Sequence, residues 1–167
     1  MRIRILTEAD EAALVELLTD EKIKQTYMLP DFSRQEEAVP LARRLIGLSR
    51  EEARFVRGME AEGTLVGFLN DVEIQDNCIE LGYVVHPVHW NKGYATAALT
   101  LAIQALFQNG FRTVLCGAFE GNPASLRVME KAGMEKIEKT DDIEYRGKLH
   151  RCLYCRIDRK DLTEHSN

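Results

Sequence analysis

One loop in this sequence has the residue types and the spacing to hold a phosphate group. It follows an apolar strand predicted over 79–85, contains Pro87, Lys92 and Gly93, and leads into a long predicted helix. Glycine permits a ligand to approach the backbone closely, and lysine adds a positive charge. The first N–H groups of a helix are unpaired and lie at the positive end of its dipole. The pattern therefore predicts a phosphate-binding site, and its plain alternative is a helix start beside a surface loop.

Two common phosphate-binding motifs are excluded. The Walker A pattern G-x-x-x-x-G-K-[ST] and the dinucleotide pattern G-x-G-x-x-G are both absent from the sequence. The spacing His86-x-x-His89 has no nearby cysteine or acidic partner, and the four cysteines lack paired zinc-site spacing. We therefore predict no metal site, and we expect the cysteines to be buried, reduced thiols.

Hydrophobic periodicity predicts the elements before this loop. Residues 2–6 alternate as a strand, and three helical patterns follow over 7–18, 21–28 and 33–50, the last of which we expect Pro40 to break. Short connections then join three predicted strands, which indicates an antiparallel meander over 54–61, 64–74 and 78–86.

The second half of the sequence alternates strands and helices. Asn122, Pro123 and Gly133 are typical of the N-cap, first turn and C-terminal stop of one helix. A strand–helix–strand unit predicts that the fourth and fifth strands run parallel. The remaining predictions are a helix over 94–109, strands over 113–119, 135–139 and 148–157, a polar loop over 141–147 and a polar tail over 158–167.

The phosphate loop resembles that of a known family. Trp90-Asn91-Lys92-Gly93-Tyr94-Ala95 is similar to the acyl-CoA pyrophosphate loop of the GNAT acetyltransferases, [QR]-x-x-G-x-[GA], in the variant typical of the RimJ/RimL-like branch. Residues 122–134 resemble the family pattern N-x-x-[AS]-x-x-[LV]-Y-x-K-x-G-F. They depart from it at Met129, where many members have the tyrosine that protonates the leaving thiolate, and at Met134, where Phe is usual.

The resemblance implies an α/β (α+β) fold. We expect a GNAT-like mixed, mostly antiparallel central sheet of about seven strands with helices on both faces, formed as a single domain by residues 1–167. It also implies acetyl-CoA as the acetyl donor. In this family the pantetheine arm enters between the fourth and fifth strands, so the backbone of Val84, Val85 and His86 would pair with it, and Asn122 would contact it. The pyrophosphate would bind the segment Trp90, Asn91, Lys92, Gly93, Tyr94, Ala95 and Thr96.

The family chemistry implies two catalytic roles. Ser125 is the expected proton donor to the thiolate in place of the missing tyrosine. Glu80, in the middle of its strand, is the expected base, acting through water, and burial would raise its pKa. The alternatives are that Glu80 only pairs with a basic neighbour, or that the amine loses its proton to water or to another group: Asp71, Glu73, Tyr145 or His150.

The helical region between the first two strands forms one wall of the acceptor site in this family. Tyr27, Met28 and Phe32 are therefore candidate acceptor-binding residues, and packing in the core is the alternative. The function implied is an acetyl-CoA-dependent N-acetyltransferase that acts by direct transfer in a ternary complex. Its acceptor would be a protein N-terminus or a small-molecule amine. A non-catalytic acyl-CoA-binding module is the alternative, and an ATP-binding protein is a more distant one.

Composition limits the remaining possibilities. A chain of 167 residues with 45% hydrophobic residues fits one domain with a sizeable core. The net charge of −5 argues against a nucleic-acid partner and is compatible with a cationic acceptor. The N-terminus has no apolar segment after its basic residues, and no stretch approaches the length of a membrane span, so we expect a cytoplasmic protein with no membrane partner. The resemblance also allows a homodimer.

Overall fold

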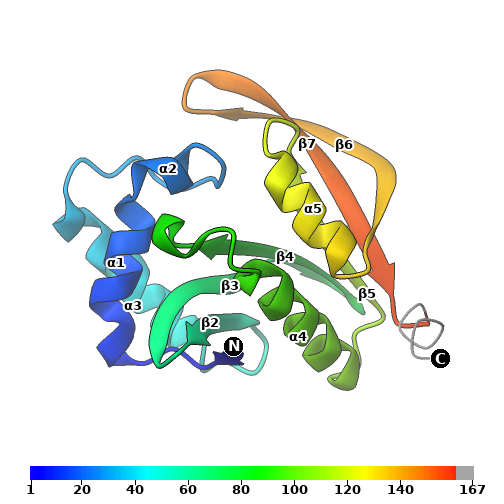
Figure 1. Cartoon of the computed structure of the whole chain (residues 1–167), viewed down its shortest axis with the longest axis horizontal. Coiled ribbons are helices and arrows are strands. Elements are labelled where there is room, and N and C mark those ends of the chain that lie inside the picture. The colour runs from blue at the N-terminus through cyan, green and yellow to red at the C-terminus, as the bar shows by residue number, and fades with distance from the viewer. Residues whose placement is uncertain (161–167) are drawn as a thin grey trace. The chain divides into compact units, whose positions relative to one another are not determined.

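The computed structural model describes residues 1–160 and contains one seven-stranded sheet, whose strands are drawn as arrows in Figure 1. The strand order is β1-β2-β3-β4-β5-β7-β6. The strands are β1 (Arg2–Arg4), β2 (Val56–Ala61), β3 (Thr64–Gln75), β4 (Cys78–Val85), β5 (Thr113–Phe119), β6 (Glu135–Tyr145) and β7 (Lys148–Asp158). The helices are α1 (Glu11–Thr19), α2 (Glu21–Lys24), α3 (Val39–Leu48), α4 (Tyr94–Gln108) and α5 (Pro123–Lys131).

The pairing of the strands confirms the predicted topology. β4 and β5 run parallel, whereas β1–β2, β2–β3, β5–β7 and β6–β7 are antiparallel. The chain divides into two compact units. The first comprises residues 1–70 and 83–98, and the second comprises residues 71–82 and the chain from Leu99 onward.

In the first unit, α1 and α3 lie side by side and bury their apolar faces (Figure 1). Their buried side chains form one hydrophobic core together with Phe68 and Val84. The helix residues in this core are Leu14, Leu17, Leu18, Ala42, Leu45 and Ile46. As predicted, the helical pattern over 33–50 is divided near Pro40, into a 3-10 turn at Gln35–Ala38 and α3. Pro40 lies in the first turn of α3, which begins at Val39. Proline is tolerated there because the first N–H groups of a helix have no partner within it.

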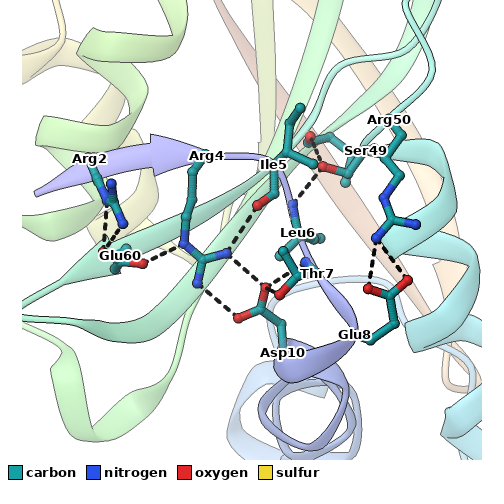
Figure 2. A network of polar contacts seen from close by, with 11 residues as sticks. Arg2, Arg4, Ile5, Leu6, Thr7, Glu8, Asp10, Ser49, Arg50 and Glu60 are labelled. Carbon is teal, nitrogen blue, oxygen red and sulfur yellow. Dashed lines mark hydrogen bonds and ion pairs between the residues drawn. The ribbon is translucent and has the colours of Figure 1, made fainter.

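A polar network fixes the N-terminal strand to the rest of this unit (Figure 2). The Arg4 guanidinium bonds both carboxylate oxygens of Asp10, at 2.8 and 2.9 Å, and also contacts Glu60 on β2. The Ser49 hydroxyl, which is fully buried, accepts a hydrogen bond from the Leu6 amide and donates one to the Val56 carbonyl, both at 2.9 Å. The network therefore satisfies the polar groups that packing buries at this edge.

We expect Arg4→Met to lower the free energy of unfolding at pH 7 by roughly 2 kcal/mol, because Asp10 would remain buried without its partner. The hydrogen bonds from Arg4 hold the pKa of Asp10 below its ordinary value. The resulting stability is present above the ordinary pKa of an aspartate and is lost as the pH falls through the lowered value. Denaturant titrations should therefore show a difference in unfolding free energy between wild type and Arg4→Met that is large at pH 7 and becomes smaller below about pH 4. Arg50→Met, which removes an exposed pair with Glu8, is the matched control and should change little.

The second unit contains the β6–β7 hairpin, which differs from the prediction. The segment 141–147, predicted as a loop, is mostly strand, and β6 continues to Tyr145. The turn consists of Arg146 and Gly147, whose φ angles of 53° and 73° suit a two-residue type I′ turn. The reason for the error is the position of β6 at the edge of the sheet, where charged residues replace the alternating apolar pattern.

The caps predicted for α5 are confirmed. The Asn122 side chain accepts from the Ser125 amide at 3.3 Å, and Pro123 lies in the first turn. Gly133 has a φ of 90°, and the Met134 amide bonds the Met129 carbonyl at 3.0 Å, which closes the helix with a Schellman motif.

All four cysteines are free, and Cys116, Cys152 and Cys155 are buried. β7 extends through Asp158, the first residue of the predicted tail, and 161–167 fall outside the described residues. Within residues 1–160, no helix is both long enough and apolar enough to span a membrane.

Candidate acyl-CoA site and catalytic residues

The predicted phosphate loop lies in the first unit, between β4 and α4. After the 3-10 turn Pro87–His89, Asn91 and Gly93 adopt left-handed backbone conformations with φ of 60° and 76°. Helix α4 then begins at Tyr94, and its first turn contains no acidic residue. Gly93 precedes the helix, where a Ser, Thr, Asp or Asn would be the usual cap, and it provides no capping oxygen. This helix start therefore fits an anionic phosphate.

The Trp90 side chain forms a structural hydrogen bond that was not predicted from the sequence. Its indole N–H donates to the Val85 carbonyl at 2.7 Å, and its own backbone N–H donates to the Pro87 carbonyl at 3.1 Å. These bonds connect the loop to the end of the strand that precedes it. The only available signal was the general need of a partly buried tryptophan N–H for an acceptor.

The end of β4 is held close to β3. The His86 amide donates to the Val66 carbonyl at 2.8 Å, and a Cβ on Gly67 would lie 2.1 Å from the Val84 carbonyl oxygen. Glycine at position 67 is therefore required for β3 to lie this close to the backbone at the end of β4. Of the backbone groups predicted to pair with pantetheine, the His86 N–H and the Val85 carbonyl thus already have partners within the protein.

The His86 side chain is also oriented by its neighbours. Its Nδ1 accepts from the Val88 amide at 3.3 Å, and its Nε2 lies 3.3 Å from a Glu16 carboxylate oxygen. The nearby His89 lies 6.2 Å, centroid to centroid, from Tyr94. Burial and the neighbouring Lys92 lower the pKa of His89. Both effects favour the neutral form of the His89 ring, whereas Lys92 and the helix start supply positive charge to this loop.

We expect Trp90→Phe to weaken the binding of CoA about fivefold, because it removes one hydrogen bond that fixes the loop. Isothermal titration with CoA measures this change directly. Val88→Ala, in the same loop and with an exposed side chain, is the control and should bind as wild type does. Unchanged affinity in Trp90→Phe would show that the indole bond does not set the loop geometry.

Glu80 lies in the second unit, half-buried in β4 between the fully buried Ile79 and Leu81. Because side chains alternate along a strand, Glu80 occupies the opposite face from these two residues. Burial raises the pKa of Glu80, as do the carboxylates of Glu73 and Asp141, whereas Lys139 lowers it. A carboxylate with a raised pKa is suited to accept a proton near neutral pH.

The predicted proton donor lies in the same unit. Ser125 is half-buried in the first turn of α5, and Asn122 caps that turn. Met129, at the position where the family pattern has tyrosine, is fully buried in the core. Met129 cannot take the role of the tyrosine, because a thioether has no proton to donate.

The three acceptor candidates lie in the first unit but differ in exposure. Tyr27 and Phe32 pack against the N-terminal core, and the Tyr27 hydroxyl contacts Asn70. Met28 is 50% exposed. Tyr27 and Phe32 therefore contribute to core packing, which was the alternative to a role in acceptor binding. Met28 is the candidate whose side chain is at the surface.

Tyr145 and His150, the alternative proton acceptors on the β6–β7 hairpin, belong to an aromatic cluster in the second unit. The His150 ring stacks on Phe119 with centroids 4.5 Å apart, and its Nε2 lies 3.2 Å from the Tyr145 carbonyl. Among residues 1–160 there is no group of three or more His, Cys, Asp or Glu side chains that could hold a metal ion.

These features can be compared with known proteins. Residues 1–135 match the family model described as an acetyltransferase (GNAT) domain. This match covers most of the chain and includes residues of both compact units. The chain therefore belongs to the GNAT acetyltransferase family and is an acyltransferase of the N-acetyltransferase class. That the whole of 1–167 forms one domain stays a prediction.

Individual relatives agree with this assignment. The chain is 24% identical over 139 residues to an uncharacterized N-acetyltransferase, YoaA, of Bacillus subtilis, covering 80% of this chain and 78% of the relative. It is similar in fold to RimL, an alpha-N-protein acetyltransferase of ribosomal L7/L12, with a TM-score of 0.83, 18% identity and coverage of 93% and 92%. A spermidine N-acetyltransferase of Vibrio cholerae, solved with CoA and spermine, matches with a TM-score of 0.81, 18% identity and 97% coverage of each chain.

Proposed function

We propose that this protein transfers acetyl from acetyl-CoA to a primary amine by direct attack in a ternary complex. The observation that supports this most strongly is the start of α4, which lacks an acidic residue and follows the left-handed Asn91 and Gly93 in a GNAT chain. The acceptor is a protein N-terminus or a small-molecule amine, the two classes on which the RimL and spermidine enzymes act. We also propose a cytoplasmic location. A homodimer stays a prediction.

The proposed roles of the residues follow from what the reaction requires. The backbone of residues 90–96, with Lys92, would hold the pyrophosphate. Asn122 and backbone groups of residues 84–86 other than the His86 N–H and the Val85 carbonyl would bind the pantetheine arm. The acceptor ammonium must lose a proton before its nitrogen can attack, and we assign that proton to Glu80 through a water molecule. The new C–N bond forms as the C–S bond breaks, and the departing thiolate takes a proton from Ser125. Ser125 then regains a proton from the newly acylated nitrogen, which must lose its second proton to become a neutral amide.

Thermal unfolding with acetyl-CoA, CoA and Mg-ATP tests the ligand class. A ligand at a hundred times its dissociation constant stabilises the folded state by about 2.7 kcal/mol, which is an easily measured shift. We expect both CoA species to raise the melting temperature and Mg-ATP to leave it unchanged. If neither CoA species shifts it, the loop is only a helix start and the proposal fails.

Turnover distinguishes an enzyme from a binding module. We expect release of free CoA thiol from acetyl-CoA when spermidine or a short peptide with a free N-terminus is added, above the rate without amine. Stabilisation by acetyl-CoA without release in the presence of either amine would favour the non-catalytic acyl-CoA-binding module.

A further inference from the structure

Tyr154, Asp141 and Lys139 form a polar cluster on the sheet face that includes Glu80. The proposed reaction gives none of these three residues a role. The register places Glu80 beside Leu115 of β5 and Gly117 of β5 beside Tyr154 of β7. Because residues two apart on a strand share a face, Glu80 and Tyr154 project from the same side of the sheet. The opposite side contains the buried residues Ile79, Leu81, Val114, Cys116 and Cys155.

Gly117 leaves space that the Tyr154 ring occupies. A Cβ on Gly117 would lie 2.9 Å from Cε1 of Tyr154. The ring thus lies over β5, the strand between β7 and the strand of Glu80. The Tyr154 hydroxyl donates to an Asp141 carboxylate oxygen at 2.7 Å, and the side chain is only 5% exposed.

A bulge in β6 places a cation over this ring. Between the pairs Lys136–Cys155 and Thr140–Leu153, β6 has three residues, 137–139, where β7 has Tyr154 alone. The Lys139 ammonium nitrogen lies 4.4 Å from the centroid of the Tyr154 ring, within the range of a cation–π interaction. Bulges of this kind redirect side chains beside functional sites.

We propose that Lys139 is a positioning residue for the base, held over the Tyr154 ring by the β6 bulge so that its positive charge acts on the Glu80 carboxyl group. This inference rests on the proposed role of Glu80 and deepens it. Asp141, bonded to Tyr154, keeps the ring in place under the ammonium group.

The charges around Glu80 show why a cation is needed there. The titratable groups that face it are Glu73 from β3, Cys78 from its own strand, Lys139 and Asp141 from β6, and Cys152 and Tyr154 from β7. Arg156 of β7 shares the face but pairs with Asp158 at 2.9 Å. Burial and the two carboxylates favour protonated Glu80, and Lys139 is the group that opposes them. Without Lys139, a larger fraction of Glu80 would be protonated and unable to accept a proton from the amine.

The proposal is tested by following the Glu80 carboxyl carbon in the full chain by NMR, with the signal assigned from its loss in Glu80→Gln. We expect Lys139→Met to move the titration midpoint up by roughly half a pH unit and Lys139→Arg to leave it near the wild-type value. Lys136→Met, on the same strand but facing Cys155, is the matched control and should not move it. An unchanged midpoint in Lys139→Met, or an equal rise in Lys136→Met, would overturn the proposal.

The titration needs neither acetyl-CoA nor an acceptor amine, so its outcome is independent of turnover. If Glu80 proves dispensable for acetyl transfer while Lys139→Met moves its midpoint, the catalytic role of Glu80 fails and the electrostatic coupling stands. If Glu80 is essential and its midpoint does not respond to Lys139, only the role of Lys139 fails.

Discussion

Glu80→Gln should lower kcat/KM for acetyl transfer by about 10²- to 10⁴-fold, the usual contribution of a positioned general base. Glutamine retains the size of the side chain but cannot accept the proton of the amine. Steady-state rates with an amine identified by CoA release measure the effect, and the affinity for CoA should not change. Glu73→Gln, an exposed rival on β3, should retain nearly full activity. A rate for Glu80→Gln equal to that of wild type would remove Glu80 from the mechanism.

The pH dependence gives a second test of the same residue. Burial raises the pKa of Glu80 above the ordinary glutamate value of 4.5, and the base must be ionised to act. Wild-type kcat/KM should therefore fall as the pH drops through a value above 4.5, and Glu80→Gln should lack this limb. A group whose pKa is raised on folding contributes stability below its unfolded pKa and loses it as the pH rises through the folded value. Glu80→Gln should accordingly be no less stable than wild type at pH 7.

Gly67→Ala should be strongly destabilising, although it adds only one methyl group. The added Cβ would lie 2.1 Å from the Val84 carbonyl oxygen, and a backbone atom cannot rotate away as a side chain can. We expect a loss of about 3 kcal/mol in unfolding free energy and a lower affinity for CoA, because the end of β4 must move. Chemical denaturation and titration calorimetry measure the two effects.

Gly47→Ala is the matched control for this substitution. Gly47 lies within α3 of the same unit, and an added Cβ would have no atom within 4 Å apart from its chain neighbours and the backbone of its own helix. Alanine is favoured over glycine inside helices, so this variant should gain about 0.5–1 kcal/mol. If Gly67→Ala were as stable as Gly47→Ala and bound CoA as wild type does, the close approach of β3 to β4 would not be essential.

The sequence was sufficient for the parts of the fold that depend on local signals. The α4 start, the Asn122 cap and the Gly133 stop were predicted correctly, because apolar periodicity and cap residues specify them. The parallel pairing of β4 with β5 was predicted correctly because a helix connects the two strands. The continuation of β6 to Tyr145 was missed because an exposed edge strand has no apolar alternation to detect.

The tertiary contacts of the candidate site could not be predicted in the same way. The Trp90–Val85 bond and the place of the Tyr154 ring over Gly117 depend on how loops and strands meet in space. No local pattern encodes the bulge that directs Lys139 to that ring. The resemblance did suggest Glu80, but its charged neighbours come from strands distant in sequence.

The N-terminal strand has a consequence for biosynthesis. Arg4 leaves the ribosome 56 residues before its partner Glu60, and Arg2 leaves 58 residues before the same residue. At about 5–20 residues per second, the interval is roughly 3–12 seconds. During this time the β1 segment has no strand to pair with, and unpaired strand segments can pair with the sheet edges of other chains. β1 has only three residues, and two of them are arginines, so we expect it to be a poor template for such pairing. The charges that fix β1 in the folded protein should therefore also limit mispairing of the growing chain.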